Sequence, residues 1–406
     1  MNVRVEPHGP GSRPMTVVDV INLSTSADTL LRERVLALRG SGIDNHIVCM
    51  DGPRVPALRA LGIPVHVVDM PRGLNPWKLV AVVIEITGHL RRIRADIVHT
   101  HCSVPGLVGR VAAWLAGVPV IIHTVHGFHF HDRTPWPVRL PYVMAERLCG
   151  LVTDTLLTQT RGDLDQAERF GIGPRAHRRR IGNGIDLTQF RPIRRASANH
   201  VPTITCVARF EPVKNHRMLL DAAHLLKQHG TSFRLRLVGD GPLRPEYEAL
   251  CRRLGIEAQV EFLGYRNDVA ELLAESDLAV LTSFKEGLPR AVLEPMAMGL
   301  PVVATRVPGT CEAVRHGDTG LAVEVGDSDG LAAALQCLIE DPELRARLGE
   351  QGRRVALEEF DERRVVDRLR ELYHSRLRGR SAGAEAATRP EAVGDGILDA
   401  HVRAKR

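Results

Sequence analysis

The stretch SFKEGLPRAVLEPMAMGLPVVAT, residues 283–305, predicts a turn, a short helix and a buried strand in succession. Gly287 falls in the turn, an apolar helical run follows, and GLPVVAT predicts a second turn leading into the strand. Two glutamates, Glu286 and Glu294, lie eight positions apart around the start of the helix. A loop, helix and buried strand in this order are typical of a parallel sheet covered by helices on both faces.

The same unit repeats in both directions along the chain. Buried strand patterns occur at 16–22, 45–50, 65–70, 95–101, 119–127 and 154–160, and then at 203–208, 234–239, 259–264, 278–283, 301–305 and 320–325. Amphipathic helix patterns separate them, which indicates α/β architecture with two Rossmann-like, doubly wound domains. The alternation breaks at 182–202, where Gly, Pro and polar residues predict a linker. Ligands of such sheets bind at the carboxyl ends of the strands, so we expect the two domains to face each other across a ligand cleft.

We therefore divide the chain into five parts. These are a flexible arm (1–14), a first Rossmann-like domain (15–190), a second Rossmann-like domain (191–360), a C-terminal helix (361–376) and a disordered tail (377–406).

Composition excludes several classes of protein. The net charge of the chain is +6. Residues 1–193 carry +7 (23 Lys and Arg against 16 Asp and Glu) and the remainder −1 (31 against 32), which favours an anionic partner for the first half. Aromatic residues make up only 4 %, which argues against a nucleic-acid-binding surface. The seven scattered cysteines form no C-x-x-C pair and indicate reduced thiols. Without an apolar run of 18 residues or a signal peptide, we expect a cytoplasmic protein, peripheral to the inner membrane face at most.

Polar and glycine residues gather after the strands of the second series. Arg209 and Lys214 follow the first strand, and Gly239 and Gly241 follow the second. Guanidinium and ammonium groups bind phosphate, and glycine lets backbone N–H groups approach phosphate oxygens. The glutamates of the opening stretch can accept hydrogen bonds from sugar and ribose hydroxyls. The edge therefore predicts a site for a sugar diphosphate.

The order Arg209, Lys214, LVGDGP (237–242), VEFLG (260–264) and the opening stretch strongly resembles the retaining GT-B glycosyltransferases of glycosyltransferase family four, whose signature is E-x7-E. The likeness is dense over residues 200–345. It is thinner in the first domain, where it rests on VHTH, TVHGFHF and GNGID.

The resemblance implies a role for each matching residue. Arg209 and Lys214 neutralise the donor diphosphate, Glu294 holds the ribose, and Glu286 lies against the donor sugar. His126 faces that sugar from the first domain, and Asn183 lies at the hinge beside Gly184. The donor site implied in full is Asn183, Arg209, Lys214, Gly239, Gly241, Glu286, Gly287, Leu288 and Glu294, with catalytic roles for His126, Arg209, Lys214 and Glu286.

The family transfers sugars without a metal or other cofactor, so none is expected here. The D-x-D patterns at 163–165 and 327–329 are interpreted as helix-start and turn chemistry. His126, His129 and His131 lack the further ligands of a zinc site. Attack on the face of the departing phosphate is preferred, and a covalent role for Glu286 stays open.

The resemblance implies a nucleotide-sugar donor, with UDP first and GDP or ADP open, and a hydroxyl acceptor. The basic first domain and the helix at 75–94 suit a lipid-linked saccharide in cell-surface polysaccharide or glycolipid synthesis. A soluble acceptor such as an aminocyclitol is the runner-up, and a non-catalytic glycan- or nucleotide-sugar-binding protein is the alternative of another class. One departure from the family is the first loop, NLSTSAD (22–28), which lacks glycine.

Overall fold

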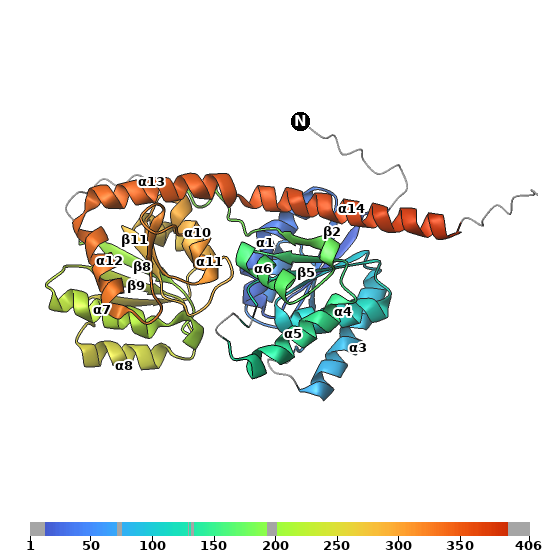
Figure 1. Cartoon of the computed structure of the whole chain (residues 1–406), viewed down its shortest axis with the longest axis horizontal. Helices are drawn as coiled ribbons and strands as arrows, with labels where there is room; N and C mark the ends of the chain where they lie inside the picture. The colour runs from blue at the N-terminus through green and yellow to red at the C-terminus, as the bar shows by residue number, and fades with distance from the viewer. Residues whose placement is uncertain (1–12, 71–74, 129, 131–133, 193–200, 389–406) are drawn as a thin grey trace, which may run out of the picture.

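The structure is a computed structural model that describes residues 13–70, 75–128, 130, 134–192 and 201–388. It contains two parallel sheets, each covered by helices, which lie side by side in Figure 1. The predicted fold class, two Rossmann-like domains in the GT-B arrangement, is confirmed. The arm at 1–14 lies outside the described residues except for its last two positions.

The first sheet has seven strands in the order β3-β2-β1-β4-β5-β6-β7, all parallel. β1, β4, β5 and β6 are buried along their whole length, although β4 (IVHTH), β5 (VIIHTV) and β6 (TLLT) include polar residues among the apolar ones. The strands are β1 (Thr16–Val20), β2 (Asp44–Cys49), β3 (Val65–Val67), β4 (Ile97–His101), β5 (Val120–Val125), β6 (Thr155–Thr158) and β7 (Arg178–Arg180). The helices are α1 (Ser24–Gly40), α2 (Val55–Ala60), α3 (Pro76–Ile93), α4 (Ser103–Ala116), α5 (Trp136–Gly150), α6 (Arg161–Arg169) and the 3-10 helix η1 (Arg175–His177).

The second sheet has six parallel strands in the order β10-β9-β8-β11-β12-β13. Its strands are β8 (Thr203–Val207), β9 (Arg234–Val238), β10 (Val260–Gly264), β11 (Leu278–Leu281), β12 (Val302–Thr305) and β13 (Gly320–Val323). The helices are η2 (Pro212–Lys214), α7 (His216–Gln228), α8 (Arg244–Leu254), α9 (Val269–Ala274), α10 (Arg290–Ala297), α11 (Pro308–Cys311), α12 (Ser328–Glu340), α13 (Pro342–Glu359) and α14 (Glu362–Thr388). The opening stretch of the sequence thus becomes the loop after β11, helix α10 and strand β12.

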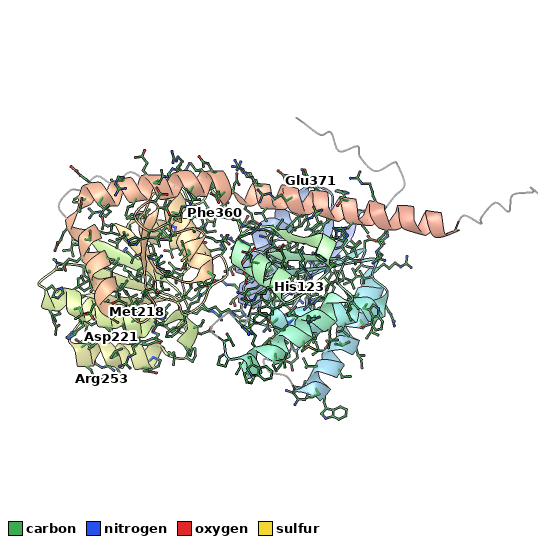
Figure 2. All side chains as sticks on the ribbon, viewed as in Figure 1. His123, Met218, Asp221, Arg253, Phe360 and Glu371 are labelled. Carbon is green, nitrogen blue, oxygen red and sulfur yellow. The ribbon has the colours of Figure 1, made fainter. Side chains whose placement is uncertain are left out.

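The chain crosses between the domains twice, and the two crossings are hydrogen-bonded to each other. The Ile185 N–H donates to the Phe360 carbonyl at 2.9 Å, and the Glu362 N–H donates to the Ile185 carbonyl at 3.1 Å. Figure 2 shows Phe360 at the junction of α13 and α14, and its side chain is buried in the second domain's core. Nearby, Arg34 Nε of α1 lies 2.9 Å from Glu362 Oε1 in a buried ion pair.

Helix α14 belongs to the first domain although it ends the chain. Val365, Leu369 and Tyr373 are buried in one cluster with Val17 of β1 and Ile122 of β5. In Figure 1, α13 and α14 run nearly end to end along one side of the molecule and cover both domains.

The predicted end of that helix was wrong. α14 continues to Thr388, so residues 377–388, expected to be disordered, are helical, whereas residues 389–406 lie outside the described part. Leu377 still packs against the first-domain core, and alanine dominates the next turns. Extending an existing helix through alanine is easy, because nucleation is the unfavourable step.

Candidate active site

A cleft of about 620 Å³ lies between the carboxyl edges of the two sheets. Residues of both domains line it. Of the residues predicted from the sequence, the cleft brings together His126, Asn183, Arg209, Lys214, Gly239, Glu286, Gly287, Leu288 and Glu294. Gly241 is the one predicted donor-site residue that does not line it.

Lys214 and Glu286 form the central ion pair of the cleft. The Lys214 ammonium lies 2.6 Å from Glu286 Oε1, and the Ser283 hydroxyl donates to the same oxygen at 2.5 Å. Lys214 ends the short helix η2 and Glu286 follows β11, so neighbouring strands hold the two groups together. Both side chains are largely buried, which strengthens their attraction and fixes their positions.

Glu294 lies in the second turn of helix α10. Its carboxylate accepts a hydrogen bond from Arg290 Nε at 2.9 Å, one helical turn earlier. Burial raises the pKa of the Glu294 carboxyl, and the positive charge of Arg290 opposes that rise. Arg290 also reaches the Gly184 carbonyl at 3.4 Å and so ties α10 to the crossing between domains.

Glycines allow three loops to stack at the cleft. A side chain at Gly287 would come within 2.7 Å of the His126 carbonyl oxygen, and one at Gly309 within 1.3 Å of the Gly287 carbonyl oxygen. Gly127 faces the same loop with a φ of +95°. The Asn183 side chain adds a hydrogen bond to the Leu288 carbonyl at 2.9 Å. The loop bearing Glu286 is therefore held from both domains.

The glycines after β9 serve close backbone packing. Gly239 lines the cleft, has a φ of +144°, and leaves no space for a side chain beside the Ala208 carbonyl. At Gly241 a Cβ would lie 2.6 Å from the Phe210 carbonyl oxygen. Arg209, which lies between Ala208 and Phe210 in the sequence, is half-exposed and pairs with Glu211 at 2.8 Å. An exposed pair of this kind is weak, so Arg209 can exchange its partner for a ligand.

His126 ends a chain of buried hydrogen bonds. Its Nε2 lies 3.1 Å from His101 Nδ1, and His101 Nε2 lies 2.8 Å from Asp19 Oδ1. Asn45 donates to the other Asp19 oxygen at 2.9 Å. Asp19, Asn45 and His101 lie on β1, β2 and β4, and His126 directly follows β5; these four strands are neighbours in the sheet.

Burial sets the charges in this chain. It lowers the pKa of His126 well below its usual value, lowers that of His101 to about 3 and raises that of Asp19 to about 6. At neutral pH both imidazoles are therefore neutral and Asp19 is ionised. An ionised Asp19 must accept the proton of His101 Nε2, so His101 Nδ1 accepts from His126 Nε2–H. Asp19 thus sets the orientation of the His126 ring through His101.

Comparison with known families agrees with this arrangement. Residues 28–184 match the model "Glycosyl transferase 4-like domain", and residues 190–355 match "Glycosyl transferases group 1". EpsD of Bacillus subtilis is 34 % identical over 291 residues, which cover 68 % of this chain and 76 % of EpsD.

The chain is a GT-B glycosyltransferase of glycosyltransferase family four.

Two further relatives of this glycosyltransferase act on different acceptors. The UDP-Gal:alpha-D-GlcNAc-diphosphoundecaprenol alpha-1,3-galactosyltransferase of Escherichia coli is 29 % identical, with coverage of 81 % of this chain and 88 % of the relative. The N-acetyl-alpha-D-glucosaminyl L-malate synthase of Bacillus anthracis is 31 % identical, with coverage of 71 % and 77 %. Among solved structures, Anabaena HepE in complex with UDP and glucose has a TM-score of 0.76 at 22 % identity, covering 89 % of this chain and all of HepE, which supports the fold.

Within the described part of the glycosyltransferase, Asp19, His99 and His101 lie close enough together to share a metal ion. Their atoms already have protein partners. His99 Nδ1 lies 2.7 Å from the Tyr373 hydroxyl and His99 Nε2 lies 2.6 Å from the Thr124 hydroxyl, in addition to the His101 contacts above. In the structure each of these donor atoms is hydrogen-bonded within the protein.

The two D-x-D patterns also have structural contacts in the glycosyltransferase. The Asp163 carboxylate accepts from the Phe128 N–H at 3.1 Å and from the Thr160 hydroxyl at 2.6 Å. Asp327 caps α12 by accepting from the Gly330 N–H at 2.8 Å. His129 and His131 lie outside the described residues.

Several cleft residues of the glycosyltransferase were missed by sequence reasoning. Arg290 is signalled only by its spacing of four from Glu294. Arg54 of the first domain stacks over the Tyr265 ring of the second, 4.5 Å from its centre, and no sequence pattern predicts that contact. The glycine-free first loop turns out to be the start of α1, which places Thr25 and Ser26 on the cleft wall.

Glu312 follows β12 and binds across the domain boundary, to Arg180 at 3.2 Å and to the backbone N–H of Arg161. It joins the two domains outside the cleft lining.

Proposed function

We propose that this glycosyltransferase moves a sugar from a nucleotide-sugar donor, with UDP-sugars first among candidates, to a hydroxyl acceptor with retention and without a metal ion. The observation that carries the proposal is the pairing of Lys214 with Glu286 beside Arg290 and Glu294 on one wall of the cleft. Two carboxylates suit two polyols, the donor sugar and the ribose, while Lys214 and Arg209 suit the diphosphate between them.

In the proposed step, the bond between the sugar anomeric carbon and the phosphate oxygen breaks, and its electron pair stays on the phosphate. The acceptor oxygen forms the new bond on the same face, and its proton passes to the departing phosphate. Lys214 and Arg209 stabilise the negative charge that develops on that phosphate. Neutral His126 faces the sugar from the first domain.

The donor class is supported by the relatives. A galactosyltransferase named for UDP-Gal is 29 % identical over most of both chains, and HepE, with the same fold, was solved with UDP. GDP- and ADP-sugars are the competing donors in the test below.

For the acceptor we propose a lipid-linked saccharide in cell-surface polysaccharide or glycolipid synthesis, at the cytoplasmic face of a membrane. The diphosphoundecaprenol-linked substrate in the name of the Escherichia coli relative supports this choice. The malate named for the Bacillus anthracis relative supports the runner-up, a soluble small molecule. No helix among the described residues is long and apolar enough to cross a membrane.

The test is nucleotide release from a panel of UDP-, GDP- and ADP-sugars with EDTA present, for the native chain and for Glu286→Ala. We expect slow release from one donor that EDTA does not affect and that the variant loses. Loss of release in EDTA, restored by a divalent cation, would refute metal independence. Donor binding without turnover for any acceptor class would favour the non-catalytic binding protein instead.

Retention is tested separately. Proton NMR of the product's anomeric signal should show the same configuration as the donor sugar, and the opposite configuration would rule out attack on the departing-phosphate face.

A further inference from the structure

Three consecutive helices of the first domain expose a large apolar surface. The chain has three tryptophans, and all three lie there with most of the side chain in solvent: Trp77 on α3 is 84 % exposed, Trp114 on α4 is 61 % and Trp136 on α5 is 66 %. Tryptophan is usually well buried, because its indole ring contributes a large apolar area. We call this surface of α3, α4 and α5 the outer apolar face.

The exposed apolar residues follow helical spacing. On α3, Trp77, Val80 and Ile84 are three and four residues apart, and on α5, Trp136, Leu140, Met144 and Leu148 are each four apart. The other side of each helix is already packed, with Ile86 of α3 and Val143 of α5 buried in separate core clusters. The apolar stripes are therefore not needed to hold the helices on the sheet.

The two stripes belong to one surface. α4 packs against both α3 and α5, and Figure 1 shows the three helices together at the lower right, on the side of the domain away from α14. The end of α4 adds Trp114 and Leu115 to the exposed apolar residues.

Exposed charges on the three helices are mostly positive. The exposed basic residues number four and the exposed acidic residues one, which leaves an excess of three positive charges. The basic residues are Lys78, Arg91, Arg92 and Arg147, and the acidic residue is Glu85. Glu146, the acidic residue of α5, is buried in an ion pair with Arg110 at 2.8 Å. A second copy of the same face would bring like charges together, whereas an anionic lipid surface complements them.

We propose that the outer apolar face docks the glycosyltransferase on an anionic bilayer. The indole rings enter the headgroup region, where tryptophan is favoured, and the lysine and arginine side chains contact lipid phosphates. Apolar burial and charge attraction add together at such a surface.

The position of the face relative to the cleft suits a lipid-linked acceptor. α3 and α5 start at the carboxyl edge of the first sheet, the edge that carries His126, and Trp77 and Trp136 lie in their first turns. Docking therefore places the mouth of the cleft beside the bilayer. This last step alone rests on the proposed function.

Tryptophan fluorescence tests the docking directly, because every tryptophan of the chain lies on the face. Vesicles of phosphatidylcholine with about a third phosphatidylglycerol should shift the emission to shorter wavelength, and brominated lipids should quench it. Sedimentation with the same vesicles measures the affinity. We expect the triple variant Trp77→Ser, Trp114→Ser, Trp136→Ser to lose at least ~tenfold in affinity, given the apolar area that three indoles bury.

A matched control changes exposed apolar residues elsewhere: Leu61→Ser, Val325→Ser and Leu357→Ser should leave vesicle binding unchanged. Circular dichroism and nucleotide release in solution should be unchanged in the tryptophan variant, which separates lost docking from lost folding. Equal binding to pure phosphatidylcholine, or no binding at all, overturns the proposal. A dimer in sedimentation velocity that the tryptophan variant breaks would instead make the face a contact between copies. Because the fluorescence, vesicle-binding and sedimentation-velocity measurements need neither donor nor acceptor, their failure is distinct from failure of the proposed function.

Discussion

The Lys214–Glu286 pair shows how a cleft can hold a positive charge ready before its ligand arrives. At 2.6 Å and largely buried, the carboxylate holds the ammonium group in place. In the proposed function, a bound diphosphate would offer Lys214 a second partner and free Glu286 to accept hydrogen bonds from the sugar hydroxyls.

Replacing Lys214 with alanine should lower nucleotide release by about 10²–10³-fold, the usual effect of removing one group that stabilises transition-state charge. The rate is measured with the donor that the panel identifies. Arg217→Ala is the matched control, because Arg217 is 65 % exposed on α7 and pairs only loosely with Asp221 at 3.8 Å. Equal losses in the two variants would show that general charge, and not this position, matters.

Buried histidines predict an acid-sensitive fold. Burial lowers the pKa values of His99, His101, His123 and His126, so the folded chain keeps them neutral while the unfolded chain protonates them below about pH 6.5. Stability is therefore full above pH 6.5 and falls as the pH drops toward about 3, the folded value for His101. For His101, whose folded pKa is about 3, the loss should reach about 2 kcal/mol of stability by pH 5. Asp19 opposes part of this loss between about pH 6 and 4, because its pKa is raised on folding.

Thermal unfolding at pH 7.5, 6.0 and 5.0 measures the effect. His123→Gln removes one buried imidazole, labelled in Figure 2, and should make the fall in Tm smaller. A Tm that stays flat to pH 5 would contradict the assignment of these groups as neutral.

The residues after single strands could be predicted from sequence, whereas their partners could not. Arg209, Lys214 and Glu286 follow strand patterns directly, so their place at one edge follows from the parallel sheet. Asp19 and His101 lie inside strands that read as plainly buried, and only the side-by-side placement of β1, β4 and β5 links them to His126.

Among the elements, the loop between β11 and α10 depends most on its neighbours. It is held between the loops after β5 and β12 at distances that only glycine allows. Gly309→Ala should therefore displace Gly287 and Glu286 and abolish most of the nucleotide release.

The matched control for that change is Gly40→Ala at the end of α1, where a side chain meets nothing within 4 Å. It should retain full release, with a small gain in helix stability. Circular dichroism checks that both variants fold, and the rate of nucleotide release measures their activity. Normal release in Gly309→Ala would mean that the loop can move without loss of the site.

Elements with a clear hydrophobic pattern in the sequence were predicted better than elements without one. Most strands stood out because they contain a short apolar run, such as LAVL in β11, whereas β7 (RRR) contains none and was not predicted. The end of α14 did not, because a segment rich in alanine, arginine and glycine has no apolar period, and its helix depends on the turns before it.

At the scale of the whole molecule, α14 joins a first domain that is otherwise complete by Arg180. Leu369 is fully buried between β1 and β5, so Leu369→Ala should destabilise the first domain by about 2–5 kcal/mol. Thermal unfolding measures the change. Glu371→Ala, two residues on and exposed on the same helix, is the control and should alter Tm little. An equal Tm for both variants would show that α14 is not part of that core.

The paired crossings limit how the domains can move. Because Ile185 and Phe360 are hydrogen-bonded where the chain passes between domains, both connections lie on one line. We therefore expect any opening of the cleft to rotate the domains about this point and to separate Arg54 from Tyr265.

The return of α14 to the first domain has a consequence for synthesis. A ribosome makes β1 first and α14 last, and α14 supplies Val365, Leu369 and Tyr373 to the cluster around Val17. Throughout translation of the second domain, that patch of the first sheet has no cover. The first domain is therefore completed only after the second domain has been made and α14 has left the exit tunnel.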